Sequence, residues 1–360
     1  MKPPEAGVRH DGAPLRVLGW PAFRNRADQP YNALLYEHLC GLGVRVEEFS
    51  ATRALTGKCD VLHLHWPDRR VRDPHLLAAL ARSGALLALL DAVRLRGTRT
   101  VWTAHNLQAH DGPLRHWLEP RFWQALTRRL DGVIALSPTG LDRVRERYPA
   151  LRDVPGWVTP LGHFRGVYPD AVDRADARAR LGVPPGARVA AFLGQVRPYK
   201  GVVHLVRVFR CLPDPSLRLL VAGRPRPSAL ATEIREAAGD DARIVCALRF
   251  VPDAEIQLYL RAADLVILPF REILNSASAV LALSFDRPVL VPDRGSMADL
   301  ARQVGAEWVR TYPGELAPEL LRDGLEWAAD PARPARPALE ALEWDRVARA
   351  TLEAYRALRD

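Results

Sequence analysis

Short apolar and β-branched runs alternate with longer stretches of helical spacing along the whole chain. In the first half, the runs that predict strands lie at residues 15–19, 44–49, 61–65, 100–104 and 132–137. In the second half, they lie at residues 189–193, 217–222, 243–246, 265–268 and 289–291. Strands that alternate with helices are typical of parallel sheets covered by helices on both faces. The pattern therefore predicts an α/β fold.

Helices are expected where apolar residues recur three and four positions apart, at residues 31–42, 120–130, 141–148, 203–211, 254–262 and 276–285. The longest apolar stretch, residues 76–95, is interrupted by Arg82, Asp91 and Arg94. A charged residue at the centre of a membrane costs about 2.5–3.5 kcal/mol on insertion scales. We therefore expect this stretch to be a helix packed against a sheet rather than a membrane span.

The length of the chain indicates two domains. With 360 residues it is too long for one ordinary hydrophobic core, and about five strands fall in each half. The Gly- and Pro-containing segment 162–174 is the expected seam, which gives a first domain of residues 1–165 and a second of residues 166–360. The helical segment 339–358 can pack on its own domain or cross back to the first, and the sequence leaves both open.

The charge is unevenly distributed. Residues 1–165 hold 24 Lys and Arg against 16 Asp and Glu, so +8 of the net charge of +9 lies in the first half. A basic half suggests an anionic partner, such as nucleic acid, an acidic lipid surface or a phosphorylated acceptor. A general bias toward arginine is the alternative explanation, because the chain has 48 Arg and only three Lys. No helix-turn-helix, RNA-recognition or zinc-finger signature is present, so no nucleic-acid partner is expected.

A loop with glycines and cations follows the first strand of the second half. The sequence GQVRPYKG at 194–201 places Gly194, Arg197, Lys200 and Gly201 between a strand end and a helix start. Exposed N–H groups at a helix N-terminus favour an anion, and Arg and Lys are the side chains that grip phosphates. The loop is neither a Walker loop nor a GxGxxG fingerprint. It therefore predicts a phosphate site that is not of the kinase or dehydrogenase type.

Two strand-to-loop segments of the first half carry His and Asp: VLHLHWPD at 61–68 and VWTAHNLQAHD at 101–111. A His near neutrality can serve as a base or a hydrogen-bond donor. The base candidates are His105, His110, Asp111 and Asp68, and the spacing does not choose between them. A buried, hydrogen-bonded pair is favoured for the two histidines of the first segment over a metal site, and the four scattered cysteines form no metal motif.

Five segments of the second half resemble GT-B glycosyltransferases of family 4 and its relatives, in the same order and spacing. They are GQVRPYKG at 194–201, LVAGR at 220–224, FVPD at 250–253, ADLVILPF at 263–270 and RPVL at 287–290. The resemblance implies two Rossmann-like domains facing a cleft, with Arg197 and Lys200 clamping the donor diphosphate. It also implies that His105 is presented to the transferred sugar.

One segment departs from the family 4 pattern, which usually has two Glu residues separated by seven positions. Glu272 matches the first, but Val280 stands where the second is expected, and Asn275-Ser276 precedes a helix start. This segment is more similar to bacterial β-mannosyltransferases of exopolysaccharide assembly. The resemblance adds Glu272, Asn275 and Ser276 to the expected donor site. Ser276 is also suited to be a helix N-cap, which is a purely structural alternative.

These observations predict a glycosyltransferase that moves a hexose, with mannose from GDP-mannose favoured by the resemblance, and needs no other cofactor and no metal. The first domain is expected to bind a glycan or lipid-linked acceptor and the second to bind the nucleotide-sugar. A sugar-nucleotide epimerase or hydrolase on the same fold and a non-enzymatic nucleic-acid-binding protein are the alternatives.

The location of the enzyme is also predicted. Residues 1–14 contain no apolar run typical of a signal peptide, so a cytoplasmic protein is expected. Arg69, Arg70 and Arg72 cluster in the first half, and residues 116–126 mix basic side chains with Trp117, Phe122 and Trp123. Aromatic and basic residues together are suited to an anionic membrane surface. We expect peripheral contact with the inner face of the membrane, or else an aromatic core with scattered surface arginines.

Overall fold

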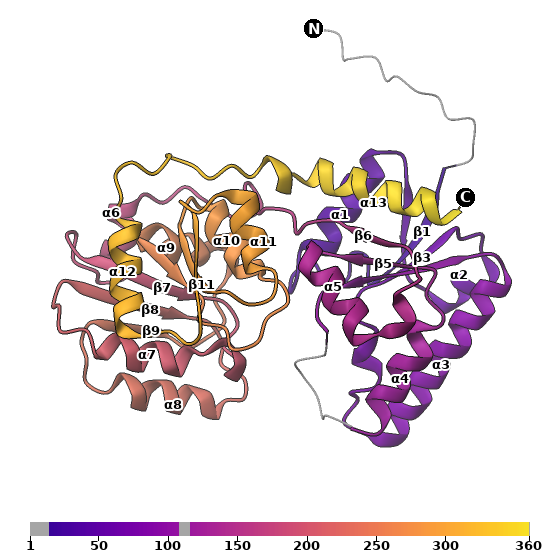
Figure 1. The fold of residues 1–360 in the computed structure, drawn as a ribbon, viewed down its shortest axis with the longest axis horizontal. Helices are drawn as coiled ribbons and strands as arrows, with labels where there is room; N and C mark the ends of the chain where they lie inside the picture. Colours follow the sequence, from indigo (N-terminus) through magenta and orange to yellow (C-terminus); the bar gives the residue numbers. More distant parts are fainter. Residues whose placement is uncertain (1–13, 108–115, 360) are drawn as a thin grey trace, which may run out of the picture.

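The computed structural model describes residues 14–107 and 116–359, which form two α/β domains side by side (Figure 1). The first sheet has six parallel strands in the order β2-β1-β3-β4-β5-β6. Its strands are β1 (Arg16–Trp20), β2 (Arg45–Glu48), β3 (Val61–Leu64), β4 (Arg99–Ala104), β5 (Gly132–Ala135) and β6 (Gly156–Val158). The interior strands β3 and β5 are buried along their whole length, as expected of parallel strands covered on both faces.

Helices cover both faces of the first sheet. They are α1 (Tyr31–Gly41), α2 (Ala51–Thr56), α3 (Leu76–Leu95), α4 (Leu118–Thr127) and α5 (Pro138–Arg147). One core cluster joins α3, α4 and α5 to the sheet, and another joins α1 and the C-terminal helix to the opposite face. Of the described helices, only α3 has the length and the apolar composition to cross a membrane. Its Leu86, Leu90 and Val93, however, pack in the core.

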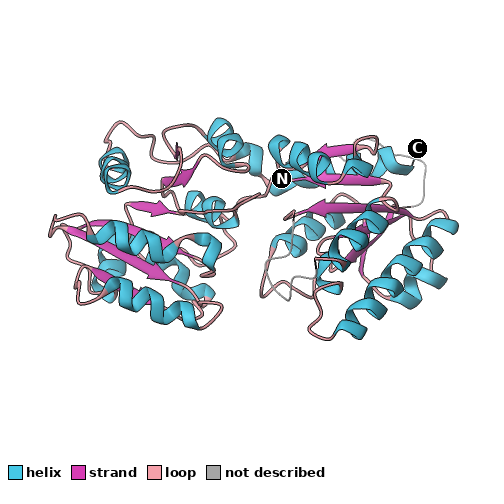
Figure 2. Ribbon diagram, turned by 60° about the horizontal axis from the view of Figure 1, so that its bottom comes forward, coloured by secondary structure: helices cyan, strands magenta, loops and turns pink. Residues whose placement is uncertain are grey.

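The second sheet also has six parallel strands, in the order β12-β11-β10-β7-β8-β9 (Figure 2). Its strands are β7 (Arg188–Leu193), β8 (Leu217–Ala222), β9 (Ile244–Ala247), β10 (Leu265–Ile267), β11 (Val289–Pro292) and β12 (Val309–Tyr312). Its helices are α6 (Arg174–Arg180), α7 (Val202–Arg210), α8 (Ala229–Ala238), α9 (Asp253–Ala262), α10 (Ala277–Ser284), α11 (Met297–Val304) and α12 (Pro318–Ala328). In Figure 1, α7 and α8 lie on one face of this sheet and α9, α10 and α11 on the other.

The last helix, α13 (Trp344–Arg359), lies against the first domain although it ends the chain. The indole of Trp344 donates a hydrogen bond to the main-chain oxygen of His163 over 2.7 Å. Farther along, the hydroxyl of Tyr355 lies 2.6 Å from Nδ1 of His63 on β3. These contacts, together with the burial of Val347, fasten the end of the chain to the core beneath α1.

Three of the side chains expected at a membrane surface are instead buried. Arg72 forms an ion pair with Glu119 over 2.8 Å, and both residues are buried. Phe122 and Trp123 are 2% and 3% exposed and pack beneath α4, in the core of the first domain. The membrane-surface interpretation of these three residues was therefore wrong. The alternative of an aromatic core is correct for Phe122 and Trp123, because the apolar stripe of α4 faces the sheet, and Arg72 is buried with its partner Glu119. Trp117, which is half exposed, remains at the surface.

Candidate active site

The carboxyl ends of the two sheets meet at a cavity of about 350 Å³. Ligands of open α/β sheets bind at this edge, because the loops that follow the strands converge there. The first domain contributes Tyr31, Trp66, Asp68 and His105 to the wall, and the second contributes Arg197, Lys200, Phe270, Asn275, Ser276 and Ser278. The volume is within the usual range for a small-molecule site, and the wall combines aromatic side chains with a few charged ones. This cavity is the candidate active site.

The phosphate loop predicted from the sequence forms one side of the cavity. The chain leaves β7 at Gly194, makes a short 3₁₀ turn at Pro198–Lys200 and enters α7 through Gly201. Gly201 has a φ of 69°, and a β-carbon there would lie 2.2 Å from the main-chain oxygen of Pro269. Only glycine therefore allows this turn to approach the end of β10 so closely. The turn directs the N-terminus of α7 toward the side of the cavity where Arg197 and Lys200 lie.

Lys200 is the more unusual of the two cations. Its ammonium lies 5.5 Å from the ring centre of Phe270, and a β-carbon on Gly194 would lie 3.7 Å from it. Burial, together with the nearby Arg197 guanidinium, lowers the pKa of Lys200 to about 8. In the described part of the chain, no carboxylate forms an ion pair with Lys200. A partly desolvated cation without a carboxylate partner favours an anionic ligand.

The start of α10 faces the same cavity. The hydroxyl of Ser276 accepts the N–H of Ala279 over 3.1 Å, which makes Ser276 the N-cap that the structural alternative predicted. Ser276 also lines the cavity, so the two interpretations are compatible. The side-chain amide of Asn275 donates a hydrogen bond to the main-chain oxygen of His105 over 3.2 Å. Asn275 therefore connects the two walls.

A buried chain of hydrogen bonds supports His105 from behind. Nε2 of His105 lies 2.9 Å from Nδ1 of His65, and Nε2 of His65 lies 2.7 Å from the hydroxyl of Tyr36. The His105 ring stacks on Trp66, with 4.3 Å between ring centres. Burial and the Arg69 charge lower the pKa of His105 to about 3. The imidazole is therefore neutral at pH 7, and Tyr36 and His65 influence which of its nitrogens carries the proton.

His63 and Asp68, from the segment 61–68, occupy different environments. His63 is buried between the hydroxyls of Tyr355 and Thr103, each 2.6 Å away, as expected for a core residue whose hydrogen bonds are satisfied. Asp68, in a 3₁₀ turn after β3, is 6% exposed and lines the cavity. Burial raises the pKa of its carboxyl from 3.8 to about 6. A carboxyl with this pKa is suited to exchange protons near neutrality.

Not every predicted site residue lies at the cavity. Gly194 and Gly201 shape the loop, whereas Arg197, Lys200, Asn275, Ser276, His105 and Asp68 line the wall. Glu272 is exposed in the loop before α10 and does not line the wall. His110 and Asp111 lie outside the described residues. Sequence reasoning did not identify Tyr31 and Ser278 as wall residues; Tyr31 follows the first strand, which is a position that the strand-end rule could have revealed.

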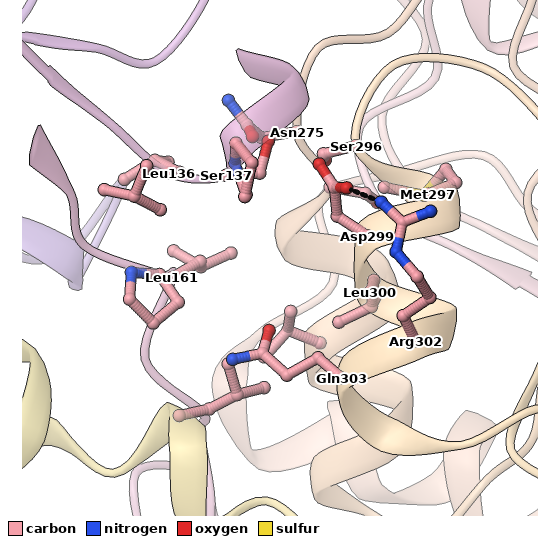
Figure 3. A pocket seen from close by; sticks show the side chains of 16 residues that line it. Leu136, Ser137, Leu161, Asn275, Ser296, Met297, Asp299, Leu300, Arg302 and Gln303 are labelled. Atoms are coloured by element: carbon pink, nitrogen blue, oxygen red, sulfur yellow. Dashed lines mark hydrogen bonds and ion pairs between the residues drawn. The ribbon is translucent and has the colours of Figure 1, made fainter. Parts of the chain in front are cut away.

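A second hollow of about 380 Å³ lies beside this cavity, between the two domains (Figure 3). Leu136 and Leu161 face Leu300 and Gln303 of α11 across it. At its edge, Asp299 of α11 accepts the N–H of Thr139 over 3.0 Å. A carboxylate at the N-terminus of α5 is favoured by the helix dipole. The Asn275–His105 and Asp299–Thr139 hydrogen bonds thus both connect the two domains beside this hollow.

Comparisons with known proteins identify the family. A family model described as glycosyl transferases group 1 matches residues 187–322. A GDP-mannose:glycolipid 4-beta-D-mannosyltransferase of Xanthomonas campestris pv. campestris is 35% identical over 335 residues, which are 92% of this chain and 89% of that protein. The chain belongs to the group 1 glycosyltransferases. A D-inositol 3-phosphate glycosyltransferase of Nocardia farcinica is 31% identical over 249 residues, 63% of this chain and 52% of that protein.

Solved structures place this glycosyltransferase in the GT-B fold, as its sequence predicted. A sucrose-phosphate synthase from Thermosynechococcus elongatus matches with a TM-score of 0.70 at 18% identity, covering 96% of this chain and 99% of that one. HepE of Anabaena, in complex with UDP-glucose, matches with a TM-score of 0.68 at 16% identity, covering 95% and 100%. The chain is therefore a nucleotide-sugar-dependent glycosyltransferase, and neither the epimerase or hydrolase nor the nucleic-acid-binding alternative is supported.

Proposed function

We propose that this glycosyltransferase transfers mannose from GDP-mannose to a hydroxyl group of a lipid-linked glycan. The observation that carries the proposal is that Arg197 and Lys200 of one domain line the same cavity as His105 and Asp68 of the other. The donor sugar and the type of acceptor are supported by the name of the Xanthomonas relative, which matches over most of both chains. In this proposal the second domain holds the donor and the first holds the acceptor.

The donor diphosphate lies between the N-termini of α7 and α10. Arg197 and Lys200 neutralise the negative charge that grows on the departing GDP, and Gly194 and Gly201 allow the backbone to approach the phosphates. Ser276 caps the N–H of Ala279, and the N-terminus of α10 favours the same anion. Charge stabilisation of a leaving group by pre-positioned donors is usually a large contribution to catalysis. Glu272 is exposed in the loop before α10 and stays a predicted sugar contact. For Glu272 to reach the sugar, that loop has to move toward the cavity.

The name of the Xanthomonas relative supports a β-mannoside as the product. Forming a β-mannoside from the α-linked donor requires inversion at the anomeric carbon, so the acceptor hydroxyl needs a base. Asp68 is better suited than His105, since the best catalytic base has a pKa near the working pH. The pKa of Asp68 is about 6 and that of His105 about 3. Asp68 removes the proton as the oxygen attacks, and His105 holds a sugar hydroxyl by a hydrogen bond. Asp111 stays a candidate from the sequence alone.

A lipid-linked acceptor requires the enzyme to work at a membrane. We place the protein in the cytoplasm, in peripheral contact with anionic lipid through the basic first domain. Trp117 and the leucines at the start of α3 are exposed there. Several arginines near an anionic leaflet contribute about 1 kcal/mol each, which is sufficient for reversible binding that weakens with salt.

The test combines ligand binding with transfer. Because a ligand that binds only the folded state stabilises it, GDP is expected to raise the melting temperature more than UDP, ADP or TDP. Incubation with radiolabelled GDP-mannose and a lipid extract of the source organism should then place label in the organic phase. Stronger stabilisation by UDP would contradict the donor assignment. Label found only as free mannose would contradict the transfer.

A further inference from the structure

An apolar groove runs along the outer surface of the first domain, away from the second. This hollow of about 430 Å³ lies between α2 and α3. The stacked rings of Trp20 and Phe49, whose centres are 3.6 Å apart, form part of its wall. Three small residues of α3, Ala85, Ala88 and Ala92, line it as well and leave the space open. Its size and lining are suited to a hydrocarbon chain.

Arginines occupy the end of the groove that lies nearest the active site. A neighbouring hollow of about 300 Å³ is lined by Arg69, Arg70 and Arg82, and no acidic residue lines it. The Arg69 guanidinium lies 5.3 Å from the ring centre of Trp66, and the Arg70 guanidinium 5.0 Å from that of Trp20. Arg82 pairs with Asp73. Within residues 14–107 and 116–359, no carboxylate forms an ion pair with Arg69 or Arg70.

The three hollows adjoin one another through shared wall residues, so an extended ligand laid over them would follow one path. Trp66 and Arg69 line both the active-site cavity and the arginine hollow, whereas Trp20 and Arg70 line both the arginine hollow and the apolar groove. A ligand along this path meets hydrogen-bonding groups, then cations, then apolar side chains. That order matches a molecule with a sugar at one end, a phosphate group in the middle and a hydrocarbon chain at the other end.

The surface beside the groove is suited to contact with a bilayer. Only 28% of the most apolar 18-residue stretch of α3 is buried. Leu77 and Leu95, toward the two ends of the helix, are 80% and 90% exposed. Figure 1 shows α3 at the periphery of the first domain, beside α2 and α4. A chain anchored in a membrane beside α3 would therefore meet exposed apolar side chains close to the groove.

We propose that the phosphate of the lipid-linked acceptor binds Arg69 and Arg70 while its hydrocarbon chain lies between α2 and α3. This assignment rests on the proposed function for the existence of such an acceptor. Arginine can bind a phosphate through two parallel hydrogen bonds, and its weakly hydrated guanidinium loses little on stacking against tryptophan. The phosphate serves as the anionic partner of these two arginines. The groove sets the distance between the membrane and the reacting hydroxyl.

The experiment uses the full chain and dodecyl phosphate, below its critical micelle concentration, as a soluble single-chain lipid phosphate. Calorimetric titration compares Ala88→Trp, which fills the groove, with Ala81→Trp, an exposed alanine of the same helix outside it. Arg70→Gln is compared with Arg152→Gln, an exposed arginine of the same domain. We expect Ala88→Trp and Arg70→Gln to weaken binding at least tenfold. The two controls should stay within twofold of wild type, and GDP binding should be unchanged in all four.

Several results would overturn the assignment. Wild-type affinity in Ala88→Trp and Arg70→Gln would do so, as would equal weakening in Ala81→Trp. Equally tight binding of the uncharged dodecyl maltoside would remove the role of the arginines. If Ala88→Trp lost GDP binding through misfolding, Ala85→Phe would replace it. Failure of mannosyl transfer in the assay above leaves this binding result unaffected, so the two proposals fail separately.

Discussion

The side-chain amide of Asn275 donates a hydrogen bond to the main-chain oxygen of His105 over 3.2 Å. Asn275 precedes α10 in the second domain, and His105 follows β4 in the first. The bond therefore joins the donor wall of the cavity to the acceptor wall. Since the reacting groups lie on different domains, the geometry of the reaction depends on contacts of this kind.

Asn275→Ala should lower turnover without removing the donor site. A hydrogen bond of this type contributes about 0.5–1.5 kcal/mol, so kcat is expected to fall about 3- to 10-fold, with GDP affinity within twofold of wild type. Steady-state kinetics and GDP titration measure the two quantities. Asp299→Asn is the control, because an amide oxygen can still accept the N–H of Thr139. A parallel loss of GDP affinity would show that Asn275 contacts the nucleotide instead.

Arg197→Ala and Lys200→Ala should reduce turnover far more than stability. Both cations line the cavity beside the N-terminus of α7, where charge matters most as GDP departs. By analogy with the loss of one oxyanion donor, we expect kcat to fall about 10²–10³-fold. Arg207→Ala, an exposed arginine on α7, is the matched control. Near-normal turnover in both cavity variants would refute the diphosphate assignment.

The affinity for GDP should fall as the pH rises above 8. Burial and Arg197 lower the pKa of Lys200 to about 8, so the free enzyme loses this charge as the pH passes that value. A bound diphosphate favours the protonated amine, and binding at higher pH therefore requires proton uptake. We expect affinity to drop about tenfold between pH 7.5 and 9.5. Calorimetry in two buffers of different ionisation enthalpy measures the proton uptake directly.

Lys200→Arg is the control for this pH dependence. A guanidinium stays protonated throughout the range, so the variant should lose most of the slope even if its affinity is lower at every pH. An unchanged slope would assign the titration to another group.

Much of the fold could be predicted from local patterns, since buried parallel strands are apolar along their whole length. The sequence marked residues 157–161 only as strand-like, where β6 forms, and gave no strand at β12; these two strands lie at the edges of the two sheets. β6 has three residues, none of them buried, and Arg310 and Thr311 of β12 are partly exposed. Neither therefore shows a continuous apolar run. The sequence left the position of α13 open, because an apolar stripe along a helix does not show which domain the helix packs against.

The phosphate loop could be predicted because glycines and cations at a strand end carry their own chemical signal. The hydrogen bonds that link His105 to His65 and Tyr36 could not be predicted. Tyr36 and His65 lie 29 residues apart in the sequence and meet only after folding. The burial of individual aromatic side chains could not be predicted either. Trp117 and Trp123 are close in sequence, yet one is half exposed and the other is in the core. Glu272 was assigned from family spacing, which does not report that its loop faces solvent.

Asp68→Asn should stabilise the protein near neutrality, and the effect should depend on pH. Burial raises the pKa of Asp68 from 3.8 to about 6, so the folded state holds the proton more tightly than the unfolded state does. The stability gained from this is complete below about pH 4 and is lost as the pH rises through 6. At pH 7.5 the buried carboxylate then costs up to about 3 kcal/mol, which the neutral amide avoids. Urea unfolding at pH 4 and 7.5 should show a gain only at the higher pH.

The same substitution should abolish most of the activity, which separates a functional carboxylate from a structural one. A positioned base contributes about 10²–10⁴-fold, so kcat/KM should fall by that factor, and its decrease below about pH 6 should disappear from the pH profile. Asp142→Asn, an exposed carboxylate of the same domain, should change neither stability nor activity. A stabilised variant with normal turnover would remove Asp68 from the reaction and leave His105 and Asp111 as the bases to test. Stability gained together with activity lost is the result expected of a carboxylate whose burial costs stability and whose charge the reaction uses.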